Sequence, residues 1–375
     1  MILEYLVCLH RQALIHAAAL ALRSLIFLEK PGPERYARRI NVWDPQGMGE
    51  VREYLDRFNE IANQYPGTAP WSFRFEGGQH QKHILFGGIT HGNEVGSLPS
   101  LVQLAENLIS QQTKFGGIIT IMLGNVEACL ADKRFIEADL NRVFLDSAPK
   151  SLEKSRAKEL MSLFDGIDLF IDFHQTIEPS ESPFFIFPFH LAGYHWARLA
   201  AGGLRLVTRD PAREFAKGQV CADEYARSLG VPGITIEMGQ KGLTELSAGL
   251  TSQCCHRAML AMDEIARGET IDKLVKSEDS SELEFFEIQS AQTFESEYMR
   301  LDPGLKNFSR VKAGQVIGQA DRAGVPLKAN MDGYLLFPKY PRRSDSHAAL
   351  GPYPSEIYNL AVPMKEHPLR VYKNG

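Results

Sequence analysis

The stretch His83-Ile-Leu-Phe-Gly-Gly-Ile-Thr-His91-Gly-Asn-Glu94 decides the fold of this chain. Its first half is a short apolar run that ends on two glycines, a pattern typical of a buried strand. The turn that follows carries His91 and Glu94 three residues apart. Imidazole nitrogen and carboxylate oxygen are both ligands that zinc accepts, and a turn after a strand can aim them at one point. The stretch predicts a strand with a candidate metal site at its end, although H-x-x-E alone is a weak signal.

The sequence around this stretch alternates between apolar strand-like runs and segments of helical periodicity. The expected strands are 72–76, 83–88, 117–123, 168–173, 184–189 and 233–237, and the expected helices are 48–64, 96–110, 150–164, 247–267 and one that ends at 223–230. Such alternation indicates an α/β sheet that is covered by helices on both faces. After about residue 275 the pattern changes. A charged stretch, 276–284, fits a linker, and short β-like runs punctuated by glycines predict a smaller all-β region beyond it.

Composition and charge exclude several classes of protein. The formal net charge of the 375 residues is −5, so the chain has no electrostatic footprint for nucleic acid. The five cysteines contain no C-x-x-C pair, which argues against a disulfide framework and for a reducing, cytoplasmic compartment. Near the N-terminus the longest charge-free run spans only residues 12–22, well below the roughly 18–20 residues that cross a bilayer. We therefore expect an amphipathic helix around residues 5–28 and no membrane partner.

A second histidine stands at the end of another apolar strand, in Asp172-Phe-His174. Sites in open α/β sheets cluster at the carboxyl ends of the strands, so His174 is a candidate third ligand. Asp172 lies two residues earlier, on the same face of the strand, and can orient a metal-bound histidine. The alternative is that His174 is a structural histidine of the core.

Two further motifs carry groups that suit substrate binding and proton transfer. In Asp139-Leu-Asn-Arg142, the arginine offers a planar fork for a carboxylate and the asparagine adds a hydrogen bond. Arg134 precedes this motif and can reach the same pocket. Glu237 ends the β-branched run 233–237, where burial would raise its pKa toward the range of a general base. Read singly, these motifs also fit a surface turn and an ion-paired structural glutamate.

In the order H-x-x-E, DLNR, DFH and IEMG, the four motifs resemble the succinylglutamate desuccinylase/aspartoacylase family, relatives of the zinc carboxypeptidases. The resemblance covers roughly residues 70 to 270, and the runs 311–318 and 329–334 are similar to the small β-barrel module of that family. It implies a mixed sheet flanked by helices and a smaller C-terminal all-β domain. The expected regions are an N-terminal helical extension (1–65), a zinc hydrolase catalytic domain (66–275) and a C-terminal β domain (280–375).

The same resemblance implies one zinc ion per chain and a role for each motif residue. The implied metal ligands are His91, Glu94 and His174, with Asp172 behind them and Glu237 as general base and acid. The implied substrate contacts are Arg134 at the scissile carbonyl, Asn141 and Arg142 at a carboxylate, and Arg227, ten residues before Glu237.

These roles describe a zinc-dependent amidohydrolase, or deacylase, that hydrolyses the amide bond of an N-acyl amino acid with zinc-activated water. A carboxypeptidase-like metallopeptidase acting on a peptide shares the same metal, base and arginine clamp, so it stays open. A non-catalytic binding protein is a third alternative, and homo-oligomer formation is left open. The phenylalanine-rich run 184–189 either lines the pocket or belongs to the core, and Tyr334 and Tyr353 are candidates for the tyrosine that some relatives contribute from the C-terminal part.

Overall fold

The computed structural model describes residues 45–209, 218–278, 283–351 and 353–372. The amphipathic helix expected near residues 5–28 lies outside these described residues. Among them, no helix is both long enough and apolar enough to cross a membrane. The four described cysteines, Cys129, Cys221, Cys254 and Cys255, are buried and free of disulfides.

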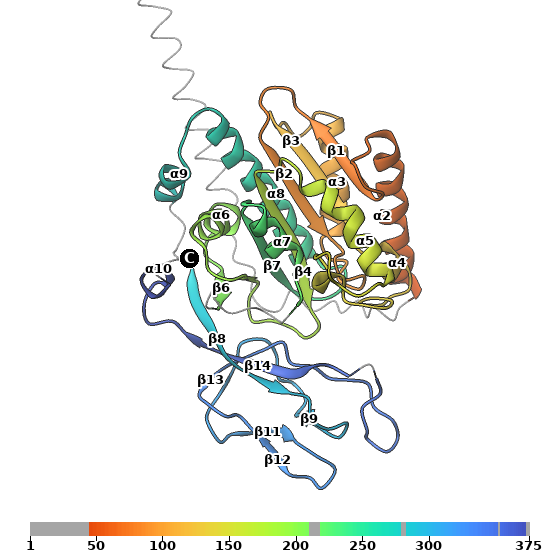
Figure 1. Ribbon diagram of the computed structural model, residues 1–375, viewed down its shortest axis with the longest axis vertical. Coiled ribbons are helices and arrows are strands. Elements are labelled where there is room, and N and C mark those ends of the chain that lie inside the picture. Colours follow the sequence, from red (N-terminus) through yellow and green to blue (C-terminus); the bar gives the residue numbers. More distant parts are fainter. Residues whose placement is uncertain (1–44, 210–217, 279–282, 352, 373–375) are drawn as a thin grey trace, which may run out of the picture. The chain divides into compact units, whose positions relative to one another are not determined.

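The centre of the fold is a mixed sheet of eleven strands in the order β1-β3-β2-β4-β7-β5-β6-β8-β14-β13-β10 (Figure 1). Its middle strands β3, β2, β4 and β7 run parallel, so their carboxyl ends lie at one edge. The strands of the α/β part are β1 (Ser72–Glu76), β2 (His83–Gly88), β3 (Ile118–Leu123), β4 (Leu169–Thr176), β5 (Phe184–Ile186), β6 (Arg205–Thr208) and β7 (Gly233–Gln240).

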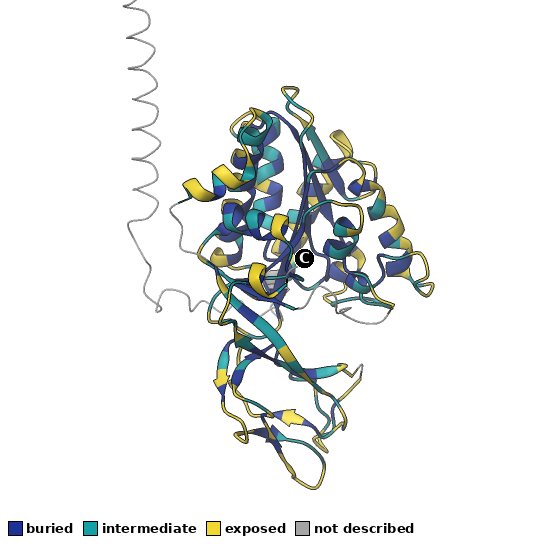
Figure 2. Cartoon of the chain, turned by 60° about the vertical axis from the view of Figure 1, so that its left-hand side comes forward, coloured by how far each residue is buried: buried dark blue, intermediate teal, exposed yellow. Residues whose placement is uncertain are grey.

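Helices cover both faces of this sheet, and Figure 2 shows the strands buried between them. Successive residues of a strand point to opposite faces. Accordingly, Ile84 and Phe86 pack with α2, α3, α6 and α8, whereas Leu85 packs with α5 and α7. The helices are α2 (Pro45–Gln64), α3 (Leu98–Ile109), α4 (Val126–Leu130), α5 (Leu152–Met161), α6 (Leu191–Ala201), α7 (Ala222–Ser228), α8 (Glu245–Ala266), α9 (Ile271–Ser277) and α10 (Pro368–Val371), with 3-10 turns η2 (Leu140–Arg142) and η3 (Ser162–Phe164).

The C-terminal strands continue the same sheet. The first of them pairs in parallel with β6, in a register that sets Leu206 against Phe285. The strands that follow are antiparallel and add to the edge, and a separate three-stranded antiparallel sheet lies beside them. These strands are β8 (Glu284–Thr293), β9 (Arg300–Leu301), β10 (Ser309–Val311), β11 (Val316–Gln319), β12 (Pro326–Lys328), β13 (Gly333–Leu336) and β14 (Glu356–Pro363).

The fold class predicted from the sequence is confirmed: a large mixed sheet flanked by helices, with a small antiparallel sheet toward the C-terminus. Some boundaries differ. The expected strand 184–189 ends at Ile186, and the expected linker 276–284 includes the end of α9 and the start of β8. The phenylalanines of 184–189 are buried and belong to the core, which is the second of the two alternatives that the sequence left open. The division into regions 1–65, 66–275 and 280–375 stays a prediction.

Candidate metal centre

The turn after β2 holds His91 and Glu94 in place. Asn125 donates its backbone N–H to the carbonyl oxygen of Ile89 at 2.7 Å, and Glu94 donates its N–H to that of His91 at 3.0 Å. Gly92 lies so close to α4 that a Cβ atom there would stand 2.4 Å from the carbonyl carbon of Ala128. Only glycine allows this approach, so Gly92 between the two candidate ligands is a packing requirement.

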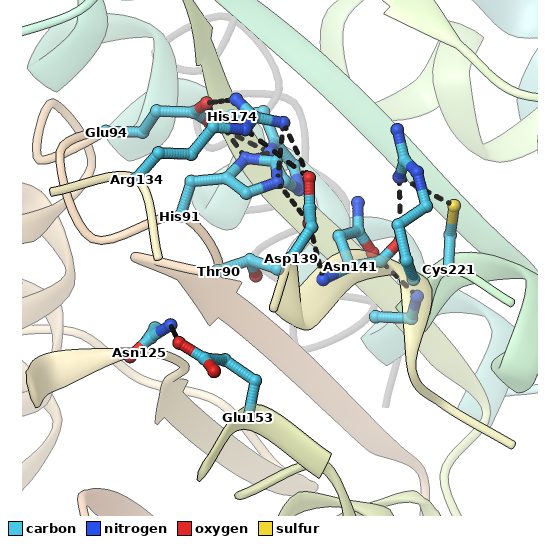
Figure 3. Close-up of polar contacts among 12 residues, drawn as sticks. Thr90, His91, Glu94, Asn125, Arg134, Asp139, Asn141, Glu153, His174 and Cys221 are labelled. Carbon is cyan, nitrogen blue, oxygen red and sulfur yellow. Dashed lines mark hydrogen bonds and ion pairs between the residues drawn. The ribbon is translucent and has the colours of Figure 1, made fainter. Parts of the chain in front are cut away.

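The neighbouring strand β4 brings His174 to the same point. Strands β2 and β4 are parallel partners, with Gly87 opposite Asp172, so the turn after β2 and the end of β4 lie side by side (Figure 3). The side chains of His91, Glu94 and His174 are buried, and one donor atom from each lies within 4.8 Å of the others. The structure therefore brings together the three residues that the motifs predicted as ligands.

The donor set suits a metal ion. Glu94 Oε1 lies 2.8 Å from His91 Nδ1, Glu94 Oε2 lies 2.9 Å from His174 Nδ1, and the two Nδ1 atoms are 3.1 Å apart. Two imidazoles and one carboxylate that converge in this way match a three-ligand catalytic zinc site, which keeps a further position for water or substrate.

Each histidine has a carboxylate on its other ring nitrogen. Asp172 Oδ2 lies 2.8 Å from His174 Nε2, and Thr90 donates its hydroxyl to Asp172 Oδ1 at 2.9 Å. Asp139 Oδ1 lies 3.0 Å from His91 Nε2. Such partners turn the ring so that the opposite nitrogen, Nδ1, faces the metal. Asp172 thus lies behind His174, where the sequence placed it. Asp139 lies behind His91 in the same way, which the DLNR motif did not reveal because its residues suggested only substrate contacts.

The charges in this cluster shift its pKa values strongly. Although burial disfavours charge, the carboxylates of Asp172 and Glu94 raise the pKa of His174 well above its ordinary value. Burial also opposes ionisation of Glu94, yet His91 and His174 hold its pKa well below the usual range. A group of buried, opposite charges at a strand edge is characteristic of a functional site.

Glu237 stands beside this cluster. Its strand β7 is the parallel neighbour of β4, and its register sets Glu237 opposite His174. The side chain is buried, and Oε2 has no hydrogen-bond partner among the described residues. Burial and the negative charge of Glu94 raise its pKa to about 8. A buried carboxylate without a partner is costly, and this argues against a purely structural role.

Arg134 reaches the same cluster from the loop after α4. Its Nη1 donates to Glu94 Oε1 at 2.8 Å, and its Nη2 lies 2.7 Å from His91 Nε2. The guanidinium also contacts Asp139 at 3.3 Å. One third of the side chain is exposed, while its guanidinium nitrogens lie against Glu94, His91 and Asp139.

Asn141 and Arg142 lie next to this group, on η2. The N–H of Asn141 donates to Asp139 Oδ1 at 2.9 Å, and its Oδ1 accepts the N–H of Ala222 at 2.8 Å. Arg142 Nη1 donates to the carbonyl oxygen of Asn141 at 2.7 Å and contacts Cys221 Sγ at 3.4 Å. The DLNR turn is thus tied to the metal cluster through Asp139 and to α7 through Asn141.

Arg227 is not brought into this group. Its Nη1 donates to Asp223 Oδ2 at 2.7 Å and to the carbonyl oxygen of Gly233 at 3.0 Å. Gly233 begins β7, whereas Glu237 lies toward the other end of that strand. These contacts lie near the start of β7, and a substrate contact of Arg227 stays a prediction.

The C-terminal strands contribute a charged pair that the motifs did not reveal. Lys339 Nζ donates to Glu356 Oε1 at 2.6 Å. Burial lowers the pKa of Lys339, and the positive charges of Arg134 and Arg142 lower it further, so the pair lies within electrostatic reach of the site. The two tyrosines considered from the sequence pack elsewhere. Tyr334 lies edge-on to Phe286, and Tyr353 stacks on Phe294.

Comparison with known proteins agrees with this arrangement. Residues 79–260 match the model of the succinylglutamate desuccinylase/aspartoacylase catalytic domain. A succinylglutamate desuccinylase of Serratia proteamaculans is 24% identical over 279 residues, which cover 70% of this chain and 81% of that protein. A probable aspartoacylase of Prochlorococcus marinus is 33% identical over 107 residues, which cover 26% of this chain and 34% of that protein.

Solved structures share the fold. The succinylglutamate desuccinylase of Vibrio parahaemolyticus superposes with a TM-score of 0.60 at 18% identity, covering 80% of this chain and 87% of that one. Murine aminoacylase 3 superposes with a TM-score of 0.52 at 19% identity, covering 76% of this chain and 96% of that one. Residues 79–260 thus match the catalytic domain of the succinylglutamate desuccinylase/aspartoacylase family, and the relatives and solved structures support this family for the chain.

Proposed function

We propose that the chain is a zinc-dependent amidohydrolase that splits an N-acyl amino acid into a carboxylic acid and an amino acid. The observation that carries this proposal is the unpartnered, buried carboxylate of Glu237 beside the convergent donors of His91, Glu94 and His174. The match to the family model and the names of similar proteins, which include succinylglutamate desuccinylases and aminoacylase 3, support the substrate class.

In this proposal, His91, Glu94 and His174 hold one zinc ion per chain. Zinc, when bound, supplies a Lewis acid that makes a water molecule acidic at neutral pH and polarises a carbonyl. Asp172 and Asp139 keep the two imidazoles in the orientation that presents Nδ1 to the ion.

Glu237 moves the proton. Its Oε2 takes a proton from the attacking water and later returns it to the nitrogen of the leaving amine. Its raised pKa suits this exchange, since a carboxyl that titrates near neutral pH can both accept and release a proton. Burial keeps bulk water away from the proton while it is held.

The arginines orient the substrate and stabilise charge. Arg134, whose guanidinium already lies against the donor group, stabilises the negative charge that develops on the carbonyl oxygen. Arg142 grips a carboxylate of the substrate, and Asn141 adds its Nδ2 donors, since its Oδ1 is engaged by Ala222. Arg227 has no part in this proposal, because its contacts lie at the other end of β7.

The test is a substrate screen on the full, zinc-reconstituted chain that reads the release of free amine. The panel contains N-succinyl and N-acetyl derivatives of glutamate and aspartate, together with short peptides. We expect hydrolysis of N-acyl amino acids and a decrease in kcat of about 10²–10⁴-fold in Glu237→Gln with unchanged zinc content. Glu159→Gln, an exposed change on α5, is the control. Cleavage of peptides alone would favour the metallopeptidase, and equal turnover by Glu237→Gln would refute the role of Glu237.

A further inference from the structure

The loop that joins α4 to α5 carries four of the site's polar side chains. It spans residues 131–151 and includes η2 as its regular element. Arg134 and Asp139 contact the metal cluster directly, and Asn141 and Arg142 follow on η2. A functional side chain on a loop needs support from a rigid element to keep its geometry.

Glu153, in the first turn of α5, supports the part of the loop before Asp139. Its Oε1 accepts the N–H of Ile136 at 2.6 Å, and its Oε2 accepts the N–H groups of Glu137 at 3.2 Å and Ala138 at 2.9 Å. Asn125, at the start of α4, donates its Nδ2 to Oε1 at 3.2 Å (Figure 3). The carboxylate is almost fully buried, so it binds three successive amides in place of water.

Lys154, the next residue, supports the part of the loop after Arg142. Its Nζ donates to the carbonyl oxygen of Leu145 and lies 3.5 Å from that of Val143. This side chain is also buried. A buried lysine and a buried glutamate side by side in the sequence thus hold the backbone on either side of the DLNR motif.

The helix that carries both residues is itself tied to the sheet. Arg156 donates from Nε to the carbonyl oxygen of Gly124 at 2.8 Å and from Nη2 to that of Leu123 at 2.9 Å. Leu123 ends β3, at the same edge as the candidate ligands. The loop therefore takes its position from β3 through α5.

We propose that Glu153 and Lys154, which we call the loop clamp, are positioning residues for Arg134, Asp139, Asn141 and Arg142. The proposal rests on the proposed function, since it assigns the clamp to the binding of the acyl amino acid. Neither side chain contacts the donor group. The clamp acts through the backbone of residues 136–145, and a displacement of about 1 Å at such a site can cost on the order of 10²-fold in rate.

The experiment compares Glu153→Gln and Lys154→Met with wild type and with Glu159→Gln, an exposed change on the same helix. This control removes the ion pair of Glu159 with Arg156 Nη1 and leaves the contacts of Arg156 Nε and Nη2 with Gly124 and Leu123 in place. In Glu153→Gln, an amide NH2 replaces an oxygen that accepts N–H groups, so the loop loses at least one of its anchors. We expect amide hydrogen exchange in residues 134–145 to accelerate in both variants, in zinc-loaded and zinc-free protein, while peptides of β2 and β4 keep their protection. We expect kcat/KM to fall by roughly 10–100-fold, with zinc content unchanged.

Three results would overturn the inference. The first is loop exchange in Glu153→Gln and Lys154→Met equal to that of Glu159→Gln. The second is faster exchange across all peptides alike, because this would make the two residues general contributors to stability. The third is faster loop exchange with KM and kcat unchanged. If wild type hydrolyses no N-acyl amino acid, the proposed function fails, and the exchange experiment still decides whether the clamp holds the loop.

Discussion

At the scale of the residue, the two candidate histidine ligands are distinguished by what lies behind them. A core histidine needs one hydrogen bond, whereas His174 lies between Glu94 and Asp172 and His91 lies between Glu94 and Asp139. The carboxylate behind each ring fixes the tautomer and increases the basicity of the nitrogen in front. The contribution of Asp172 and Asp139 to metal binding can therefore be tested by substitution, as that of the ligands can.

We expect Asp172→Asn to weaken zinc binding by about 10–100-fold, because an amide at this position holds the imidazole of His174 less firmly in the required tautomer. Competition with a chromophoric chelator measures the affinity. Asp168→Asn is the control. Asp168 lies just before the start of β4 and binds Lys82 at 2.7 Å, whereas the candidate ligand His174 lies near the other end of that strand. Equal zinc affinity in both variants would contradict the role of Asp172.

A different histidine, His83, contributes to the loss of stability in acid. His83 is buried at the start of β2, with Nε2 2.8 Å from Thr120 Oγ1. Burial and the nearby Arg74 lower its pKa to about 4, below the value of 6.5 in an unfolded chain. Because the unfolded state binds the proton more readily, the stability that depends on neutral His83 is complete above pH 6.5 and is lost as the pH falls toward 4.

The free energy of unfolding of the wild type falls between pH 6.5 and pH 4. We expect this fall to be smaller by roughly 2–3 kcal/mol in His83→Gln, which has no imidazole to protonate. Urea unfolding of the zinc-free protein at both pH values measures this difference. His256→Gln, an exposed change on α8, should leave the decrease as it is in wild type. An unchanged pH dependence in His83→Gln would show that His83 does not carry it.

At the scale of the element, the sequence predicts the bounds of apolar strands that end in a turn. It does not predict how far a strand continues through polar residues. Strands β1 and β2 have the expected bounds, but β4 and β7 extend to Thr176 and Gln240, which pair with each other. Hydrophobic periodicity cannot detect a strand that goes on through polar residues. The role of Asp139 beside His91 is also invisible in the local sequence. Its partner His91 is 48 residues away, and this contact depends on how the loop packs.

The turn between β2 and α3 depends on one glycine. A Cβ atom on Gly92 would stand 2.4 Å from backbone atoms of both Ala128 and Cys129, so the turn and α4 would have to separate. We expect Gly92→Ala to destabilise the protein by about 1–3 kcal/mol and to lower its zinc content. Thermal unfolding and metal analysis measure the two effects.

Gly49→Ala is the matched control. Gly49 lies within helix α2, and a Cβ atom there meets no other atom within 4 Å. Alanine is the better helix former, so this variant should gain about 0.5–1 kcal/mol while zinc content stays constant. If Gly92→Ala behaves like Gly49→Ala, the close approach to α4 is not what holds the turn.

At the scale of the whole described part, the C-terminal strands continue the main sheet. The sequence predicted a separate β region after residue 275, because glycine-punctuated runs replace the strand–helix alternation. It could not reveal that β8 joins the edge of the main sheet at β6, since pairing between strands distant in sequence leaves no local pattern. A buried asparagine adds a second connection. Asn307 Nδ2 donates to the carbonyl oxygens of Glu178 and Pro179, just after β4, and its Oδ1 accepts the N–H of Phe337.

We expect the α/β part and the C-terminal strands to unfold together. In a Trp43→Phe background, tryptophan fluorescence follows the α/β part through Trp71 and Trp196, while far-UV circular dichroism follows both parts, so their urea transitions should coincide. Asn307→Ala should lower the free energy of unfolding by roughly 2–4 kcal/mol, because it removes two hydrogen bonds to the carbonyl oxygens of Glu178 and Pro179 and leaves the N–H of Phe337 without its acceptor. Asn330→Ala, at an exposed position, should change it little. Separate transitions in wild type would mean that the shared sheet does not couple the two parts, and equal midpoints for the two variants would remove Asn307 from that coupling.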